Sequence, residues 1–198
     1  MRSILFVPAV VVSAALLAFA CGKSDPKKSG EPGSREEAKK DKGFLETQVG
    51  SVNRAKDVDC MNHLRAFAME VSTNSKEMLR GKTLNGTDVP FLLMESSTLV
   101  KDPAYLYCAN VHPQNSRPAD DAVRLRDPSA SDYEGPSNFP VNAAIFGQAS
   151  RFPVLWDKEP NHVGYRFVLF LDGQVREVAN RDFKAQVLDV VDSFRTGG

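Results

Sequence analysis

The chain has 198 residues, with 25 basic and 25 acidic side chains and a hydrophobic fraction of 42%. This length suits one medium-sized domain with short extensions and is too small for two hydrophobic cores of ordinary size. The formal net charge is zero, whereas nucleic-acid binding by counterion release requires a surface of clustered lysine and arginine. We therefore expect no nucleic-acid partner, and the composition also excludes collagen-like, coiled-coil and wholly disordered chains.

The first 20 residues have the pattern of a secretory signal peptide. Arg2 precedes an apolar run that ends in small residues, and Cys21 follows directly. This arrangement resembles the signal of bacterial lipoproteins, which implies that a diacylglycerol group is attached to Cys21 and that the membrane is a partner. An uncleaved membrane anchor, for which the apolar run is at the short limit, and a plain signal peptide with an incidental cysteine are the alternatives. Each of the three exports the rest of the chain.

A highly charged segment follows the cysteine. Residues 22–42 contain seven basic and five acidic side chains but one apolar residue, so burial of apolar surface cannot offset the entropy lost on ordering. We predict a disordered tether over residues 21–42 and a globular domain over residues 43–198. Gly22, instead of aspartate, follows the lipid site and by the common lipoprotein sorting rule favours the outer membrane of the cell envelope, facing the periplasm or the cell surface.

Two cysteines remain if Cys21 carries lipid. Cys60 and Cys108 would then lie in an oxidising compartment, where two cysteines can pair in a disulfide. Closing a loop of about 48 residues would stabilise the domain by roughly 4 kcal/mol. The alternative is two buried free thiols, and neither cysteine has the spacing of a zinc site.

Apolar periodicity predicts a helix over about residues 50–80. The apolar positions largely keep the i, i+4, i+7 spacing, so one face is apolar and the other is charged, and Gly81 is a plausible end. The members of this stripe are Val52, Cys60, Leu64, Phe67 and Val71. Residues 89–94 and 104–108 are short candidates for extended structure, and eight of the 12 prolines fall between residues 103 and 160, which predicts loops and short strands there.

The C-terminal part predicts a hairpin and a helix. Two β-prone runs within residues 165–178 flank Asp172-Gly173, a pair that suits a two-residue turn. Asn180 is then placed to cap a helix whose apolar face contains Phe183, Val187, Val191 and Phe194. The expected fold class is α+β, with a long amphipathic helix packed on a small antiparallel sheet.

The same region carries the marks of a known family. Nine residues separate His162 from Asp172-Gly173, and this spacing resembles the C-terminal signature of bacterial type IV pilin-like proteins, which include prepilins and pseudopilins. Three further segments resemble family motifs in the same order: the start of a helix at residues 60–65, a cysteine segment at 105–108 and a tyrosine segment at 131–133. The resemblance spans roughly residues 52–180 and implies a pilin-like head.

Two departures from the family concern assembly. Residues 47–59 are polar, where a pilin has the hydrophobic helix with which it polymerises, and Gln174 stands where the family often has histidine. The resemblance therefore implies a pilin-like head on a lipid anchor, in a structural or interaction role linked to type II secretion or type IV pilus machinery. Pilin or secretion components are the expected protein partners.

Three histidines and two carboxylates are the candidates for chemistry. Asp157, His162 and Asp172 could bind a divalent cation or act as acid and base, but we favour a structural role in which His162 bonds a loop or the hairpin end. His63 is expected at the edge of the core and His112 in an ordinary loop. The motifs of common enzymes are absent from the sequence, so we expect neither a catalytic site nor a cofactor.

Two further functions compete with the structural role. A small molecule or cation could bind the loops at 109–162, or an enzyme could be centred on His162. Four aromatic residues are candidates for the lining of such a binding surface, although aromatic side chains in a loop-rich domain more often fill the core. They are Tyr133, Phe139, Phe146 and Trp156.

Overall fold

The computed structural model describes residues 37–112 and 116–196. The predicted signal peptide, Cys21 and the tether up to residue 36 lie outside these ranges. Contacts divide the chain into two units, residues 1–40 and 41–198. Apart from the first four residues of the long helix described next, the features that follow lie in the second unit. Among the helices of the described part, none combines the length and the apolar character needed to span a bilayer.

A long helix, α1 (Glu37–Leu79), opens the described chain. It begins inside the segment predicted as tether and ends, as predicted, before Gly81, whose φ of 75° is the left-handed conformation typical of a helix terminus. From Cys60 onward the predicted apolar stripe is buried, while its neighbours Arg65 and Met69 are exposed. The stripe therefore positions one face of α1 against the core.

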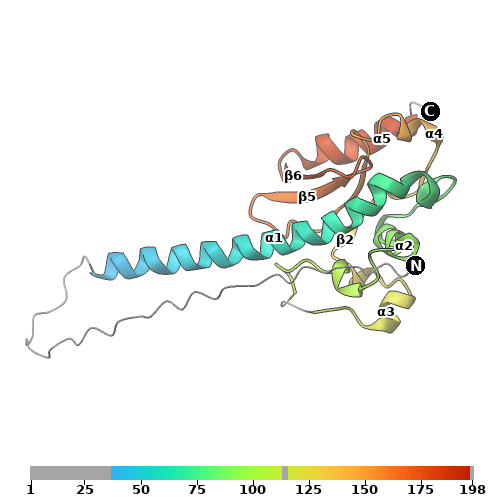
Figure 1. Ribbon diagram of the computed structural model, residues 1–198. Coiled ribbons are helices and arrows are strands. Elements are labelled where there is room, and N and C mark those ends of the chain that lie inside the picture. Colours follow the sequence, from blue (N-terminus) through green and yellow to red (C-terminus); the bar gives the residue numbers. More distant parts are fainter. Residues whose placement is uncertain (1–36, 113–115, 197–198) are drawn as a thin grey trace, which may run out of the picture. The chain divides into compact units, whose positions relative to one another are not determined.

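Antiparallel sheets form the other half of an α+β fold (Figure 1). A four-stranded sheet has the order β2-β4-β5-β6, and a two-stranded sheet pairs β1 with β3. The strands are β1 (Thr83–Leu84), β2 (Tyr133–Glu134), β3 (Phe139–Pro140), β4 (Pro153–Asp157), β5 (Tyr165–Phe170) and β6 (Val175–Ala179). Strand β4 lies inside the proline-rich region and is buried along its whole length. It is an inner strand of the sheet, between β2 and β5.

The predicted hairpin is confirmed, but its turn is longer than expected. Strands β5 and β6 pair with Leu169 opposite Val175, and the amide of Phe170 donates to the carbonyl oxygen of Gln174 at 2.8 Å. The amide of Gly173 donates back to the carbonyl oxygen of Phe170 at 2.9 Å. The turn thus has three residues, with Gly173 at a φ of 83°, the arrangement of a type I turn followed by a bulge.

Two predicted extended segments are helical instead. Residues 89–94 belong to α2 (Val89–Ser96), which has a proline in its first turn, and residues 103–106 form the 3₁₀ turn η2 (Pro103–Leu106). In η2 the carboxylate of Asp102 accepts a hydrogen bond from the amide of Ala104 at 3.0 Å. A short apolar run cannot by itself distinguish a strand from a helix that is buried on several sides, and this ambiguity explains the error at α2.

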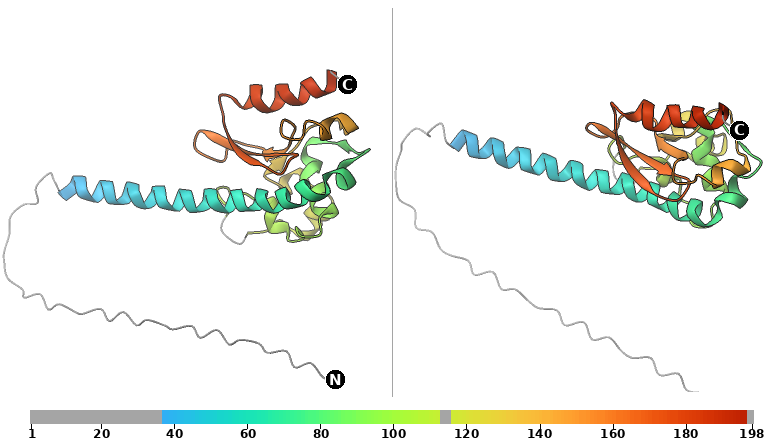
Figure 2. Two further views of the ribbon diagram at one scale, coloured as in Figure 1. Left: turned by 45° about the horizontal axis from the view of Figure 1, so that its top comes forward. Right: turned by 90° about the horizontal axis from the view of Figure 1, so that it is seen from above.

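The C-terminal helix starts later than predicted. Asn180 lies in a turn before the helix and does not cap it. Its backbone N–H donates a hydrogen bond to the carbonyl oxygen of Gly164 at 3.0 Å. A π-helical turn, η4 (Lys184–Leu188), leads into α5 (Asp189–Thr196). The predicted apolar face is correct, because Phe183, Val187 and Val191 are buried. Figure 2 shows the β5–β6 hairpin between α1 and α5.

Aromatic side chains fill the core. Tyr133, Phe139 and Trp156 are buried and Phe146 is half-buried, so the interpretation of these four as an exposed binding surface is wrong. The remaining short elements complete the chain: 3₁₀ turns η1 (Gly86–Asp88) and η3 (Pro128–Ala130), and helices α3 (Asp120–Arg124) and α4 (Ala143–Phe146).

Candidate functional site

A buried histidine lies beside the disulfide. The structure joins Cys60 of α1 to Cys108, which follows η2, and both cysteines are inaccessible to solvent. His162 comes from the loop between β4 and β5, and its Nε2 atom is 3.6 Å from the sulfur of Cys108. The side chain of His162 is fully buried, so a substrate could reach the imidazole only after the surrounding side chains move.

The Nδ1 side of His162 is tied to α1. Oδ1 of Asp57 lies 2.7 Å from His162 Nδ1 and accepts a hydrogen bond from Nδ2 of Asn110, also at 2.7 Å. Asn110 Nδ2 is itself 2.8 Å from His162 Nδ1 and carries only donor hydrogens. We therefore assign the Nδ1 proton to the bond with Asp57. Burial favours a higher pKa for Asp57, but hydrogen bonds from His162 and Asn110 outweigh it and lower that pKa.

The Nε2 side of His162 faces a second carboxylate. Oδ2 of Asp157, at the end of β4, is 3.4 Å from Nε2 and accepts the amide of Phe167 at 2.6 Å. Asp157 is completely buried, and its Oδ1 atom has no hydrogen-bond partner among the described residues. Burial raises the pKa of Asp157 to about 7, although the amide of Phe167 and the charge of Arg166 oppose this rise.

Aromatic rings enclose this cluster. The ring of Tyr165 stacks on the imidazole of His162 at 5.2 Å, and the ring of Phe167 meets the imidazole edge-on at 4.6 Å. The sulfur atoms of Cys60 and Cys108 and a nitrogen of His162 are within 4.8 Å of one another. The site is thus a dry cluster of potential metal ligands in which a disulfide occupies two of the donors.

Asp172 does not belong to this cluster. It lies in the hairpin turn, where its Oδ1 accepts the amide of Gln174 at 3.0 Å. Strand β5 separates this turn from His162, and its six residues alone span roughly 20 Å at about 3.3 Å per residue. The predicted trio of Asp157, His162 and Asp172 therefore does not form one site, because His162 and Asp172 flank opposite ends of the same strand.

Both ends of the predicted signature nevertheless contact α1. His162 bonds Asp57 near one point of the helix. Gly173 packs against a second point, where an added Cβ atom would lie 2.6 Å from the Cβ of Ser72 and 3.0 Å from the carbonyl oxygen of Ala68. The nine residues between His162 and Asp172 thus include the whole of strand β5. At position 173 a residue larger than glycine does not fit without a shift of its neighbours.

The other two histidines take part in polar contacts. His63 is half-buried, with Nδ1 2.7 Å from the carbonyl oxygen of Tyr107, in agreement with a place at the core edge. His112 is more engaged than an ordinary loop residue. Its ring stacks on Tyr107 at 3.7 Å, and its Nε2 is 3.3 Å from Oδ2 of Asp132.

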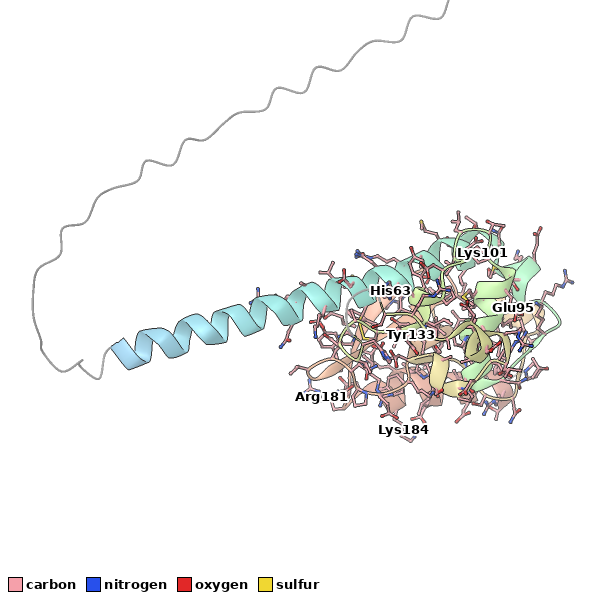
Figure 3. The ribbon with its side chains drawn as sticks, turned by 90° about the horizontal axis from the view of Figure 1, so that it is seen from below. His63, Glu95, Lys101, Tyr133, Arg181 and Lys184 are labelled. Carbon is pink, nitrogen blue, oxygen red and sulfur yellow. A yellow bond between two sulfur atoms is a disulfide. The ribbon has the colours of Figure 1, made fainter. Side chains whose placement is uncertain are left out.

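An open groove of about 830 Å³ runs along α1. Figure 3 labels His63, on the helix side of this groove. Its walls come from α1, from the η2 region and from Gly173 of the hairpin turn, including Asp59, His63, Met69, Asp102 and Tyr105. This groove is outside the 109–162 loops, and the sequence pattern did not predict it because its lining residues come from three distant segments.

A second buried carboxylate was also missed. Glu70 is 1% exposed and accepts five hydrogen bonds, from Asn74, Ser97, Leu99 and two groups of Thr98. Burial opposes ionisation, but these donors together lower the pKa of Glu70 to about 2. Its place beside Phe67 and Val71 on the apolar stripe was the available signal, since a charge there must be paired or hydrogen-bonded.

Comparison with known proteins identifies no relative. The chain matches no protein-family model, and no curated protein or solved structure is significantly similar to it. The fold and the buried cluster must therefore be interpreted from their own geometry.

Proposed function

We propose that this protein is a lipid-anchored component of the bacterial cell envelope that carries a pilin-like head. Its role is structural or interactive, at type II secretion or type IV pilus machinery, and its lipid is attached at Cys21. The observation that carries this proposal is the placement of the signature residues. His162 and Gly173 both contact α1, one at each end of strand β5. Such contacts are expected of a motif that defines a head in which a helix packs on a hairpin.

Burial of the cluster supports a structural role. His162, Asp157 and the disulfide have almost no exposed surface, and binding or catalytic residues need a route to their ligand. The exposed surface that remains available for a partner includes the groove along α1, where Met69 is 56% exposed. Exposure of this apolar side chain to water is unfavourable, and a protein partner that covers it would remove that exposure.

Site-specific photo-crosslinking in the producing cell tests the protein-partner part. A photo-crosslinking amino acid replaces Met69, and the matched control replaces Leu125, which is exposed to a similar degree on another element. The proposal expects covalent capture of a pilin or secretion subunit, identified by mass spectrometry, from position 69 but not from position 125. Capture of such subunits from neither position would contradict it.

The lipid anchor is tested separately. Cys21→Ser should move the protein from the membrane fraction to the soluble fraction and abolish incorporation of labelled palmitate. If the variant remains in the membrane with an uncleaved N-terminus, the segment before Cys21 is a membrane anchor instead.

A small-molecule or cation-binding lipoprotein is the second candidate function. The groove along α1 favours it, because its lining residues include two carboxylates, an imidazole and a phenol, from Asp59, Asp102, His63 and Tyr105. This location replaces the 109–162 loops as the preferred place for a ligand. A ligand screen by thermal shift should find compounds whose stabilising effect disappears in Tyr105→Ala, while the control Leu125→Ala keeps it.

A further inference from the structure

The cluster around the disulfide contains more potential metal ligands than a structural cross-link between two cysteines requires. Its donors come from three separate places in the fold: Cys60 on α1, Cys108 after η2 and His162 in the loop after β4, and their ligand atoms lie within 4.8 Å of one another. The three side chains are buried. Two cysteines and one histidine form a donor set that suits Zn²⁺ and similar thiophilic divalent cations, with the fourth position of the ion left to water.

The distance between His162 and Cys108 already suits a tetrahedral ion. Bonds of about 2.3 Å to sulfur and about 2.0 Å to nitrogen place the ligand atoms of a tetrahedral zinc site about 3.3 to 3.8 Å apart. His162 Nε2 lies 3.6 Å from the sulfur of Cys108. The sulfur atoms of Cys60 and Cys108, bonded to each other here, reach such a separation only after the disulfide is reduced.

The surroundings of His162 orient it as a metal ligand. Histidines bound to metals usually donate the other ring N–H to a carboxylate, which fixes the tautomer and the ring direction. Here Nδ1 donates to Asp57, which Asn110 holds in place, so the lone pair of Nε2 points into the cluster.

We propose that the dithiol form of this protein binds one thiophilic divalent cation through Cys60, Cys108 and His162, and that disulfide formation releases it. Both cysteines are thiols when the chain is synthesised, and metal binding displaces their two protons. A disulfide donor then removes two electrons from the two sulfur atoms, which form the S–S bond, and the donor is reduced to a dithiol. The bonded sulfurs no longer have the thiolate charge that holds the cation.

Cobalt absorption tests this proposal on the full chain. A Cys21→Ser background leaves Cys60 and Cys108 as the two thiols. The protein is reduced with a phosphine, refolded without oxygen and titrated with Co²⁺. We expect one equivalent to bind, with thiolate-to-cobalt charge-transfer absorption and the visible bands of a tetrahedral ion, and we expect the oxidised protein to show neither.

Two variants test the third ligand and the carboxylate that orients it. His162→Gln and Asp57→Asn should each weaken Co²⁺ binding at least tenfold, whereas the control His63→Gln, which changes a histidine outside the cluster, should keep the affinity. Circular dichroism confirms that each protein is folded. If His162→Gln does not fold, Asp57→Asn decides the question.

Three results would overturn the proposal. The reduced protein could fold but show no cobalt bands, or it could remain unfolded with Co²⁺ and Zn²⁺ present. Alternatively, folded His162→Gln and Asp57→Asn could bind Co²⁺ as tightly as the unsubstituted protein, which would mean that the thiols alone hold the ion.

Discussion

Two buried carboxylates in this domain respond to burial in opposite ways. Glu70 and Asp157 are both almost inaccessible to solvent, yet the pKa of Glu70 is lowered to about 2 and that of Asp157 is raised to about 7. Glu70 accepts five hydrogen bonds, whereas one oxygen of Asp157 accepts an amide and the other has no partner. The number of donors, and not burial alone, decides whether a buried carboxylate is stable in its charged form.

This difference separates two kinds of contact between α1 and the rest of the domain. Around Glu70, the helix is joined to residues 97–99 by hydrogen bonds to a charge. Around Asp157, the helix is joined by a covalent bond and by the imidazole of His162. We expect acid to weaken the first contact, because it neutralises Glu70. We expect reducing agents to weaken the second, because they break the disulfide.

Loss of the disulfide should lower the free energy of unfolding more than any other change that tests these two contacts. The double substitution Cys60→Ala and Cys108→Ala removes a cross-link that closes a loop with a sequence separation of 48, which should lower the free energy of unfolding by about 4 kcal/mol. Urea unfolding followed by circular dichroism measures the change. A loss below about 1 kcal/mol would show that noncovalent contacts suffice around Asp157, as they do around Glu70.

Gly173 tests the contact of the hairpin turn with α1, next to Glu70. Gly173→Ala should cost about 3 kcal/mol, because the new Cβ meets Ala68 and Ser72 and the residue has a positive φ. Gly164→Ala is the matched control, since Gly164 has a φ of 86° with no atom within 4 Å of the added Cβ. It should cost about 1–2 kcal/mol. Equal losses in thermal or urea unfolding would mean that the turn does not press on the helix.

Removal of the charge at Glu70 should lower the free energy of unfolding somewhat less than Gly173→Ala does. Glu70→Gln retains the shape but replaces a carboxylate that accepts five hydrogen bonds, so we expect a loss of about 2 kcal/mol at pH 7. Because the pKa is lower in the folded protein, the stabilisation is complete above the unfolded-state value of about 4.3 and is lost as the pH falls toward about 2. The difference in stability between the two proteins should therefore shrink between about pH 5 and pH 2. A difference independent of pH would contradict the assigned charge.

The smallest effect is expected at Asp157. Asp157→Asn keeps an oxygen for the amide of Phe167 and removes a charge whose ionisation is costly in this position, so we expect a change within about 1 kcal/mol at pH 7. Comparison with Glu70→Gln under the same conditions is the direct test of the contrast. A loss at Asp157 as large as that at Glu70 would mean that its negative charge pairs strongly with His162.

Local patterns in the sequence were enough to predict several elements. The apolar stripe from Cys60 to Val71 and the stop at Gly81 follow from helical periodicity, and the hairpin follows from two β-prone runs around Asp172-Gly173. The errors fall where local pattern is ambiguous. The apolar run at 89–94 suits a buried helix as well as a strand, and Asn180 is one of several polar residues in a turn.

The sequence by itself determined the α+β class, the buried helix face and the β5–β6 pairing, because each depends on neighbours within a few residues. Only the tertiary structure decided that Asp57, Asn110, Asp157 and His162 meet, and that Asp172 lies away from them. Asp57 and His162 are separated by 105 residues, and no periodicity relates positions so far apart. Their contact arises because the stripe on α1 and the interior faces of the sheet must bury the same apolar surface, which brings the polar groups at their margins together.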